Sequence, residues 1–133
     1  MEAKELVKSY FQAITEGRFG DIHKYKSPNA TYWIRGENSW PLGGWRTPED
    51  MGATFKLIKE RFPQGVKITI HSIIAEGSKA VVQLNNYAVR LDGKVYDNEI
   101  VILMKIENGF IVEEREFLDT IHVNDLFCGG LLR

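Results

Sequence analysis

Cysteine and histidine, which build most disulfides and many metal sites, are scarce in this chain. There is one cysteine, Cys128, and the three histidines, His23, His71 and His122, are scattered along the sequence. A lone cysteine cannot form an internal disulfide. Neither a phosphate-binding loop nor a dinucleotide fingerprint is present. We therefore expect no metal and no cofactor, and a reducing, cytoplasmic compartment.

Concentrated charge of one sign and long apolar runs are also lacking. The formal net charge is -1 and no basic cluster exceeds two residues, so binding to nucleic acid or an anionic membrane surface is not expected. No stretch approaches the roughly 20 apolar residues of a membrane span. Residues 1–7 carry charges where a secretory signal needs an apolar core. These patterns favour a soluble protein.

What is present predicts one domain over residues 1–133, with 44% hydrophobic residues for its core. Apolar spacing predicts helices over 3–15 and 19–25. A third helix is expected from Thr47 as cap and Pro48 at the first position to about Arg61, with Phe55 on its apolar face. Residues 30–34 are expected to form a strand. The segment 35–46, rich in glycine and tryptophan, is interpreted as a lid or rim.

The second half of the chain is rich in strand signals. Segments 66–75, 79–91, 94–106 and a last strand containing Glu116 are separated by turns at Gly77, Gly93 and Asn108-Gly109. They predict a four-stranded antiparallel meander. Helices first and strands last indicate an α+β domain and not a parallel doubly wound sheet.

The run Ile100 to Met104 is apolar at every position, which indicates that both faces of the sheet are covered. With three helices available for one face, a second copy of the protein is the economical cover for the other, so we expect a homodimer through the sheet. The alternative is cover by the chain's own termini, including residues 121–132.

Glu116 is the leading functional candidate. It lies on a strand among apolar neighbours, and burial of a carboxylate disfavours its charged form, so its pKa should rise toward the range useful for proton transfer. Strict alternation places Glu116 on one face with Glu114, Val112 and Leu118. The alternative is an exposed or arginine-paired strand carboxylate.

The order of helical hairpin, strand, helix and meander, with Tyr96-Asp97-Asn98 and Arg115 to Asp119 on the last strands, resembles the SnoaL-like families of the nuclear-transport-factor-2-like superfamily. The resemblance implies a cone-shaped, curved antiparallel sheet wrapped around three amino-terminal helices, with an apolar pocket. Members include isomerases, epoxide hydrolases, cyclases, dehydratases and non-catalytic proteins, so the fold alone does not choose a function.

Individual positions resemble two enzyme families. Tyr10 matches the oxyanion-binding tyrosine of the steroid isomerases, whose base falls at Ile34 and whose second acid falls near Ile102. The limonene-epoxide hydrolases place their water-activating aspartate on Glu116 and their water-orienting tyrosine on Tyr32. Their arginine–aspartate pair falls on Gln83 and Asn85. Because the amides of Gln83 and Asn85 cannot act as a general acid, we do not expect the mechanism of the limonene-epoxide hydrolases in its usual form.

The predicted site therefore has Glu116, Tyr32 and Asn85 as catalytic residues. The predicted substrate-binding residues line the pocket or close over it: Tyr10, Trp33, Ile34, Trp40, Trp45, Phe55, Gln83, Tyr87 and Asn98. The leading hypothesis is a cofactor-independent acid/base enzyme of isomerase, hydrolase, dehydratase or cyclase type acting on a small apolar molecule. The alternatives are a non-catalytic binding protein and an interaction module with a filled cone.

Overall fold

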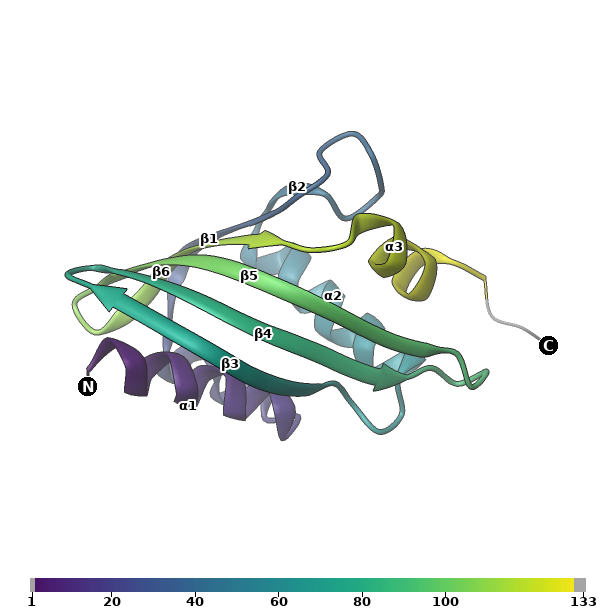
Figure 1. Ribbon diagram of the computed structural model, residues 1–133, viewed down its shortest axis with the longest axis horizontal. Helices are drawn as coiled ribbons and strands as arrows, with labels where there is room; N and C mark the ends of the chain where they lie inside the picture. Colours follow the sequence, from purple (N-terminus) through teal and green to yellow (C-terminus); the bar gives the residue numbers. More distant parts are fainter. Residues whose placement is uncertain (1, 131–133) are drawn as a thin grey trace.

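Six strands form one curved, open sheet in the order β2-β1-β6-β5-β4-β3 (Figure 1). The structure is a computed structural model, and it describes residues 2–130. The strands are β1 (Lys26–Ile34), β2 (Gly44–Arg46), β3 (Lys67–Glu76), β4 (Lys79–Val89), β5 (Val95–Glu107) and β6 (Phe110–Phe117). The expected α+β class with a curved sheet is confirmed. Residue 1 and residues 131–133, at the ends of the predicted domain, lie outside the described residues.

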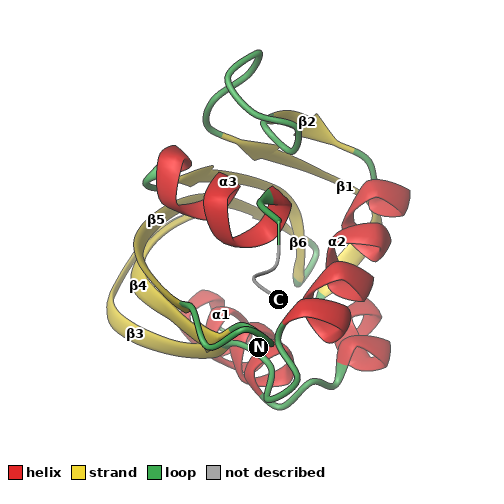
Figure 2. Cartoon of the chain, turned by 90° about the vertical axis from the view of Figure 1, so that its right-hand side faces the viewer, coloured by secondary structure: helices red, strands yellow, loops and turns green. Residues whose placement is uncertain are grey.

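Helices cover the concave side of the sheet. They are α1 (Ala3–Thr15), the 3₁₀-helix η1 (Phe19–Lys24), α2 (Pro48–Arg61) and α3 (Thr120–Cys128). Figure 2 shows the curved sheet with α1 below it, α2 on the side away from β3 and β4, and α3 between β5 and α2 in this view. The predicted bounds of α1 agree with the structure. Thr47 caps α2 as expected, because its side chain accepts the Asp50 N–H while Asp50 accepts the Thr47 N–H.

The prediction of a four-stranded meander was incomplete. Strands β3 to β6 do form it, and the Asn108-Gly109 turn has positive φ at both residues, 53° and 79°, as a two-residue hairpin of this kind requires. However, β1 lies parallel to β6 and pairs Tyr32 with Glu114. The sheet is therefore mixed and not purely antiparallel. This pairing joins strands about 80 residues apart, which local patterns could not predict.

The helix α3 was not predicted. Its N-cap is Asp119, whose side chain accepts the His122 N–H at 3.1 Å. Two guanidinium groups hold the other end: the partly buried Arg61 donates to the carbonyl of Gly129, and the buried Arg90 donates to that of Asp125. α3 thus covers the concave side, not the outer face of the sheet. The alternative to a second copy was that the chain's own termini, including residues 121–132, cover the outer face. Residues 131 and 132 of this segment lie outside the described part of the chain.

None of the helices in the described part of the chain is long and apolar enough to cross a membrane.

Candidate functional site

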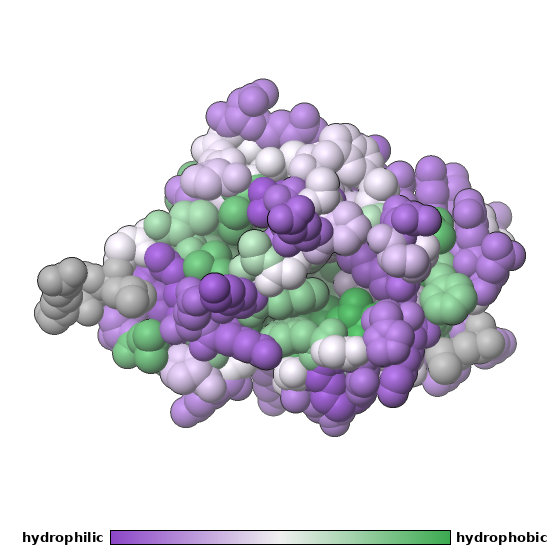
Figure 3. All heavy atoms as spheres, turned by 180° about the vertical axis from the view of Figure 1, so that it is seen from behind, coloured by the Kyte–Doolittle hydropathy of each residue, from purple (hydrophilic) through white to green (hydrophobic). Residues whose placement is uncertain are grey.

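A cavity with about 90 Å³ of space for the centres of water-sized molecules lies between the concave face of the sheet and the helices. This is room for several waters or a small ligand. Figure 3 shows apolar side chains gathered in a hollow on this side of the molecule. The lining is mostly apolar. Besides Trp40 and Thr54, the residues of the wall with polar side chains are Tyr10, Tyr32, Asn86, Tyr96, Glu114 and Glu116.

Two carboxyl groups enter the cavity from β6. Side chains alternate along a strand, so residues 114 and 116 point to the same face. Both are buried, with 1% and 8% of their surface exposed, respectively. Glu116 lies in register between Ile34 of β1 and Ile102 of β5. The expected placement of Glu116 among apolar neighbours in a pocket is therefore what the structure shows.

Glu116 has one polar partner in the described part of the chain. The Tyr32 hydroxyl donates a 2.6 Å hydrogen bond to its Oε2. Burial raises the pKa of Glu116 to about 7, with a further upward contribution from Glu114, while the Tyr32 hydrogen bond and the Lys26 charge lower it. The carboxyl group thus exchanges its proton near neutral pH.

Glu114 has a different environment. Its Oε2 accepts hydrogen bonds from the Tyr10 hydroxyl at 2.9 Å and from the Lys26 ammonium at 2.6 Å. The Lys26 side chain is itself only 11% exposed, and its Nζ lies 4.9 Å from the centroid of the Tyr32 ring. Lys26 therefore neutralises one carboxylate and contacts the tyrosine that holds the other.

Both tyrosine hydroxyls remain protonated. Burial raises the pKa of Tyr10 and of Tyr32 well above the usual value, and the neighbouring carboxylates raise it further. Each hydroxyl can therefore serve as a hydrogen-bond donor over the physiological pH range. The arrangement can orient two carboxyl groups and keep one of them close to half-protonated in an apolar cavity.

Six of the predicted site residues line this cavity together: Tyr10, Tyr32, Ile34, Trp40, Phe55 and Glu116. Trp40 comes from the segment interpreted as a lid or rim, and its indole N–H donates to the Arg35 carbonyl at 2.9 Å. The geometry brings these residues into one place, while their roles in binding or catalysis stay predictions.

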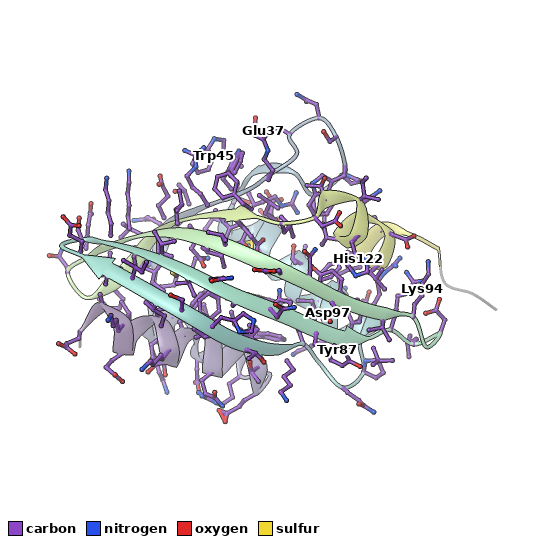
Figure 4. The ribbon with its side chains drawn as sticks, viewed as in Figure 1. Glu37, Trp45, Tyr87, Lys94, Asp97 and His122 are labelled. Atoms are coloured by element: carbon purple, nitrogen blue, oxygen red, sulfur yellow. The ribbon has the colours of Figure 1, made fainter. Side chains whose placement is uncertain are left out.

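The predicted placement of Gln83, Asn85 and Tyr87 in the cavity is wrong. All three lie on the outer face of the sheet, where Gln83 donates to Glu99 at 2.7 Å and Asn85 donates to Asp97 at 2.5 Å. Figure 4 labels Tyr87 and Asp97 on the side of the sheet opposite α2. The inward residues of β4 are one position along the chain, so that Leu84 and Asn86 line the cavity.

Trp33, Trp45 and Asn98 do not line the cavity either. Trp33 follows Tyr32 on β1 and so points outward, where Arg115 lies over its ring at 4.7 Å and over that of Trp45 at 5.4 Å. Asn98 is buried and holds neighbouring groups: its amide donates to the Tyr96 hydroxyl at 3.2 Å and to the Asp119 carbonyl at 3.1 Å. It lies on the inner face of β5 and connects this strand to Asp119 at the start of α3.

Four polar residues of the site were missed: Glu114, Lys26, Asn86 and Tyr96. The signal for Glu114 was the alternation that places it on the face of Glu116. Asn86 was one register step from the residues chosen. Lys26 had no local signal, because its contact with Glu114 depends on a side-chain pairing across 88 positions of sequence.

No cluster of three or more histidine, cysteine, aspartate or glutamate side chains within residues 2–130 is arranged to hold a metal ion.

Comparisons with known proteins agree with this architecture. A sequence model of the family described as SnoaL-like domain matches residues 7–114. No curated protein gives a significant match. A protein of unknown function with a cystatin-like fold from Xanthomonas campestris is 22% identical, with a TM-score of 0.81 over 96% of this chain and 98% of that chain.

Two further solved structures share the fold. IdmH of Streptomyces antibioticus, for which a polyketide cyclase activity has been proposed, is 15% identical, with a TM-score of 0.77 over 92% of this chain and 95% of that chain. TerC, co-crystallised with polyporic acid, is 16% identical, with a TM-score of 0.75 over 92% and 95% of the two chains. At these identities the likeness shows the fold alone.

Proposed function

We propose that this chain, which belongs to the SnoaL-like domain family, binds a small apolar molecule in the cavity and transfers a proton to or from it through Glu116. The observation that carries the proposal is the burial of Glu116 in the wall of an apolar cavity, with its pKa raised to about 7. An acid/base catalyst is most effective when its pKa lies near the working pH.

The surrounding residues support such a transfer. Tyr32 fixes one oxygen of Glu116 through its 2.6 Å hydrogen bond. The apolar lining keeps water away from the carboxylate and so increases its basicity relative to an exposed one. Isomerisation, hydration, dehydration and cyclisation can all proceed by proton transfer, and Glu116 would donate or accept the proton in any of them.

The alternative is a binding protein without catalysis. Its support is Ile34, an apolar residue in register beside Glu116, at the position where the resemblance to steroid isomerases places the catalytic base. TerC was co-crystallised with polyporic acid. In this alternative the cavity shelters an apolar metabolite, and Glu116 serves as a hydrogen-bonding group.

A general probe of a desolvated carboxylate base tests the proposal without knowledge of the substrate. In 5-nitrobenzisoxazole a base removes the ring C–H proton, the N–O bond breaks, and 2-cyano-4-nitrophenolate is released. We expect the protein to accelerate this reaction above buffer, with a rate that rises through about pH 7 as Glu116 ionises. The product is followed by its absorbance.

The matched variants are Glu116→Gln and Glu113→Gln, which remove one carboxylate from the inner and the outer face of β6, respectively. Glu116→Gln should lose at least tenfold of the acceleration, and Glu113→Gln should keep it. A Glu116→Gln variant that retains the wild-type rate and pH profile would contradict the role of Glu116 as base. Binding of the probe without acceleration would favour the alternative.

We also propose that the outer face of the sheet pairs with a second copy of the chain. Ile74, Val81 and Leu103 stand in register across β3, β4 and β5, and they are 66%, 37% and 40% exposed. Charged residues of both signs lie beside these apolar residues: Lys105 of β5 pairs with Glu113 of β6 at 3.6 Å. A two-fold interface requires such a self-complementary surface.

A further inference from the structure

Asn86 is the one residue of the cavity wall, within the described part of the chain, whose polar side chain has a buried atom without a partner. Its Oδ1 is shielded from solvent and accepts no hydrogen bond. A buried acceptor left unpaired costs free energy, so a native structure that keeps one usually has a partner for it that the chain does not supply.

A second polar group lies close to Asn86 on the same face. Asn86 stands in register with Asn98 of β5, and the Asn98 amide donates to the hydroxyl of Tyr96 at 3.2 Å. Tyr96 also lines the cavity and is 1% exposed. Its hydroxyl accepts this bond, and no acceptor for its proton is found among residues 2–130. Burial raises the pKa of Tyr96, which keeps that proton in place.

The two unused groups are complementary to one chemical group. Asn86 offers an acceptor and Tyr96 a donor, and a hydroxyl can donate to the first and accept from the second. An anionic group would find no opposite charge there, because the charged side chains of the cavity wall, Glu114 and Glu116, are both acidic. Burial of an unpaired charge is strongly unfavourable.

This polar pair is offset from the acid along the sheet, although Glu116 is near enough to Tyr96 to raise the pKa of its hydroxyl, after burial as the larger cause. The residue opposite Glu116 on β5 is Ile102, whereas the residue opposite Asn86 is Asn98, four positions away. Four residues of strand span about 13 Å. Leu84, which lies between Asn86 and Val82 on the inner face of β4, is an apolar part of the wall.

We propose that Asn86 and Tyr96 form a second subsite that binds a hydroxyl group of an uncharged, otherwise apolar ligand whose other polar end reaches Glu116. This inference rests on the proposed function and names its ligand class: neutral apolar alcohols or phenols with polar groups at both ends, and not carboxylic acids or phosphates.

Two probes of similar shape test the subsite. 2,6-Dihydroxynaphthalene carries a donor at both ends, and 6-methoxy-2-naphthol replaces one donor with an ether that can only accept. We expect the wild-type protein to bind the diol about 5- to 10-fold more tightly in calorimetric titrations at pH 6.5, as one hydrogen bond to a buried acceptor predicts.

The variants are Asn86→Leu and, on the opposite face of the same strand, Asn85→Leu. Asn86→Leu should bring the preference close to 1 while the methoxy compound still binds, and Asn85→Leu should keep the wild-type preference. Tyr96→Phe, which removes only a hydroxyl, should weaken binding of the diol severalfold and serves as a second variant should Asn86→Leu fail to fold.

Each remaining outcome has one meaning. A wild-type protein that binds both probes equally, or a preference that survives in Asn86→Leu, overturns the subsite but leaves the proposed function in place. Tighter binding of 6-carboxy-2-naphthol than of the diol overturns the neutral ligand class. Failure of the wild-type protein to bind any of these compounds overturns the proposed function, and the subsite with it.

Discussion

Glu114 and Glu116 point into one cavity from positions two residues apart, yet only Glu114 has a cation at hydrogen-bond distance, the Lys26 ammonium at 2.6 Å. Glu116 has the Tyr32 hydroxyl instead. Lys26 thus balances the charge of Glu114, and burial raises the pKa of Glu116 to about 7. This asymmetry gives the cavity one carboxyl group that can exchange a proton at neutral pH.

The Lys26→Met variant should be strongly destabilised, because it leaves Glu114 buried without its cation. The expected loss in free energy of unfolding is about 3–5 kcal/mol, measured by urea denaturation. The control is Lys105→Met, which removes an exposed pair with Glu113 and should change stability by less than about 1 kcal/mol. Equal losses in the two variants would show that the buried pair has no special weight.

Stability should depend on pH through Glu116. Its pKa is raised in the folded protein from the usual 4.5 to about 7, so the unfolded chain releases this proton first as pH rises. The contribution of Glu116 to the free energy of unfolding is therefore greatest below about pH 4.5 and is lost as pH rises through 7. The free energy of unfolding falls by roughly 3 kcal/mol over this range because of Glu116.

The comparison that isolates this effect is wild type against Glu116→Gln, unfolded by urea between pH 4.5 and 8. The variant should gain on the wild type as pH rises from 4.5 to about 7, and the gain should level off above that pH. A difference that stays constant, or that moves in favour of the wild type with rising pH, would be incompatible with a raised pKa.

Asn86→Leu should stabilise the unliganded protein, since it replaces a buried acceptor without a partner by an apolar side chain of similar size. We expect a gain of about 1–2 kcal/mol in the free energy of unfolding. Asn85→Leu, which removes hydrogen bonds on the outer face, should give no such gain. A loss of stability in Asn86→Leu would indicate that this amide serves the fold and not a ligand.

Leu103→Glu should shift the protein toward monomer, because it places a charge in the apolar row proposed to pair two copies. Light scattering coupled to size-exclusion chromatography measures the mass. Leu91→Glu changes another exposed leucine, outside that row, and should leave the mass at twice that of the chain. A monomeric wild-type protein at micromolar concentration would contradict the proposed pairing.

The sequence predicted those parts of the structure that depend on local spacing. Helix α1, the cap at Thr47 and the Asn108-Gly109 hairpin follow from periodicity and turn chemistry, and alternation along β6 placed Glu116 inward. The inward face of β4 was misjudged by one residue, and a one-residue slip moves every side chain to the other face. That slip moved Asn85 into the predicted site and left Asn86 out of it.

Contacts between distant segments could not be predicted in this way. The parallel pairing of β1 with β6 brings Lys26 to Glu114, and it turns Trp33 outward onto Arg115. Nothing in the neighbourhood of Lys26 in the sequence indicates a buried lysine. The single-domain organisation and the cytoplasmic compartment stay predictions.

The most direct test of the central claim is the titration of the Glu116 carboxyl group by carbon-13 NMR, with the signal assigned by its absence in Glu116→Gln. The account predicts a midpoint near pH 7, and a still higher one in Tyr32→Phe, because the Tyr32 hydrogen bond lowers the pKa. A midpoint at or below the usual value of about 4.5 would contradict burial of this carboxyl group in an apolar cavity and, with it, the proposed proton transfer.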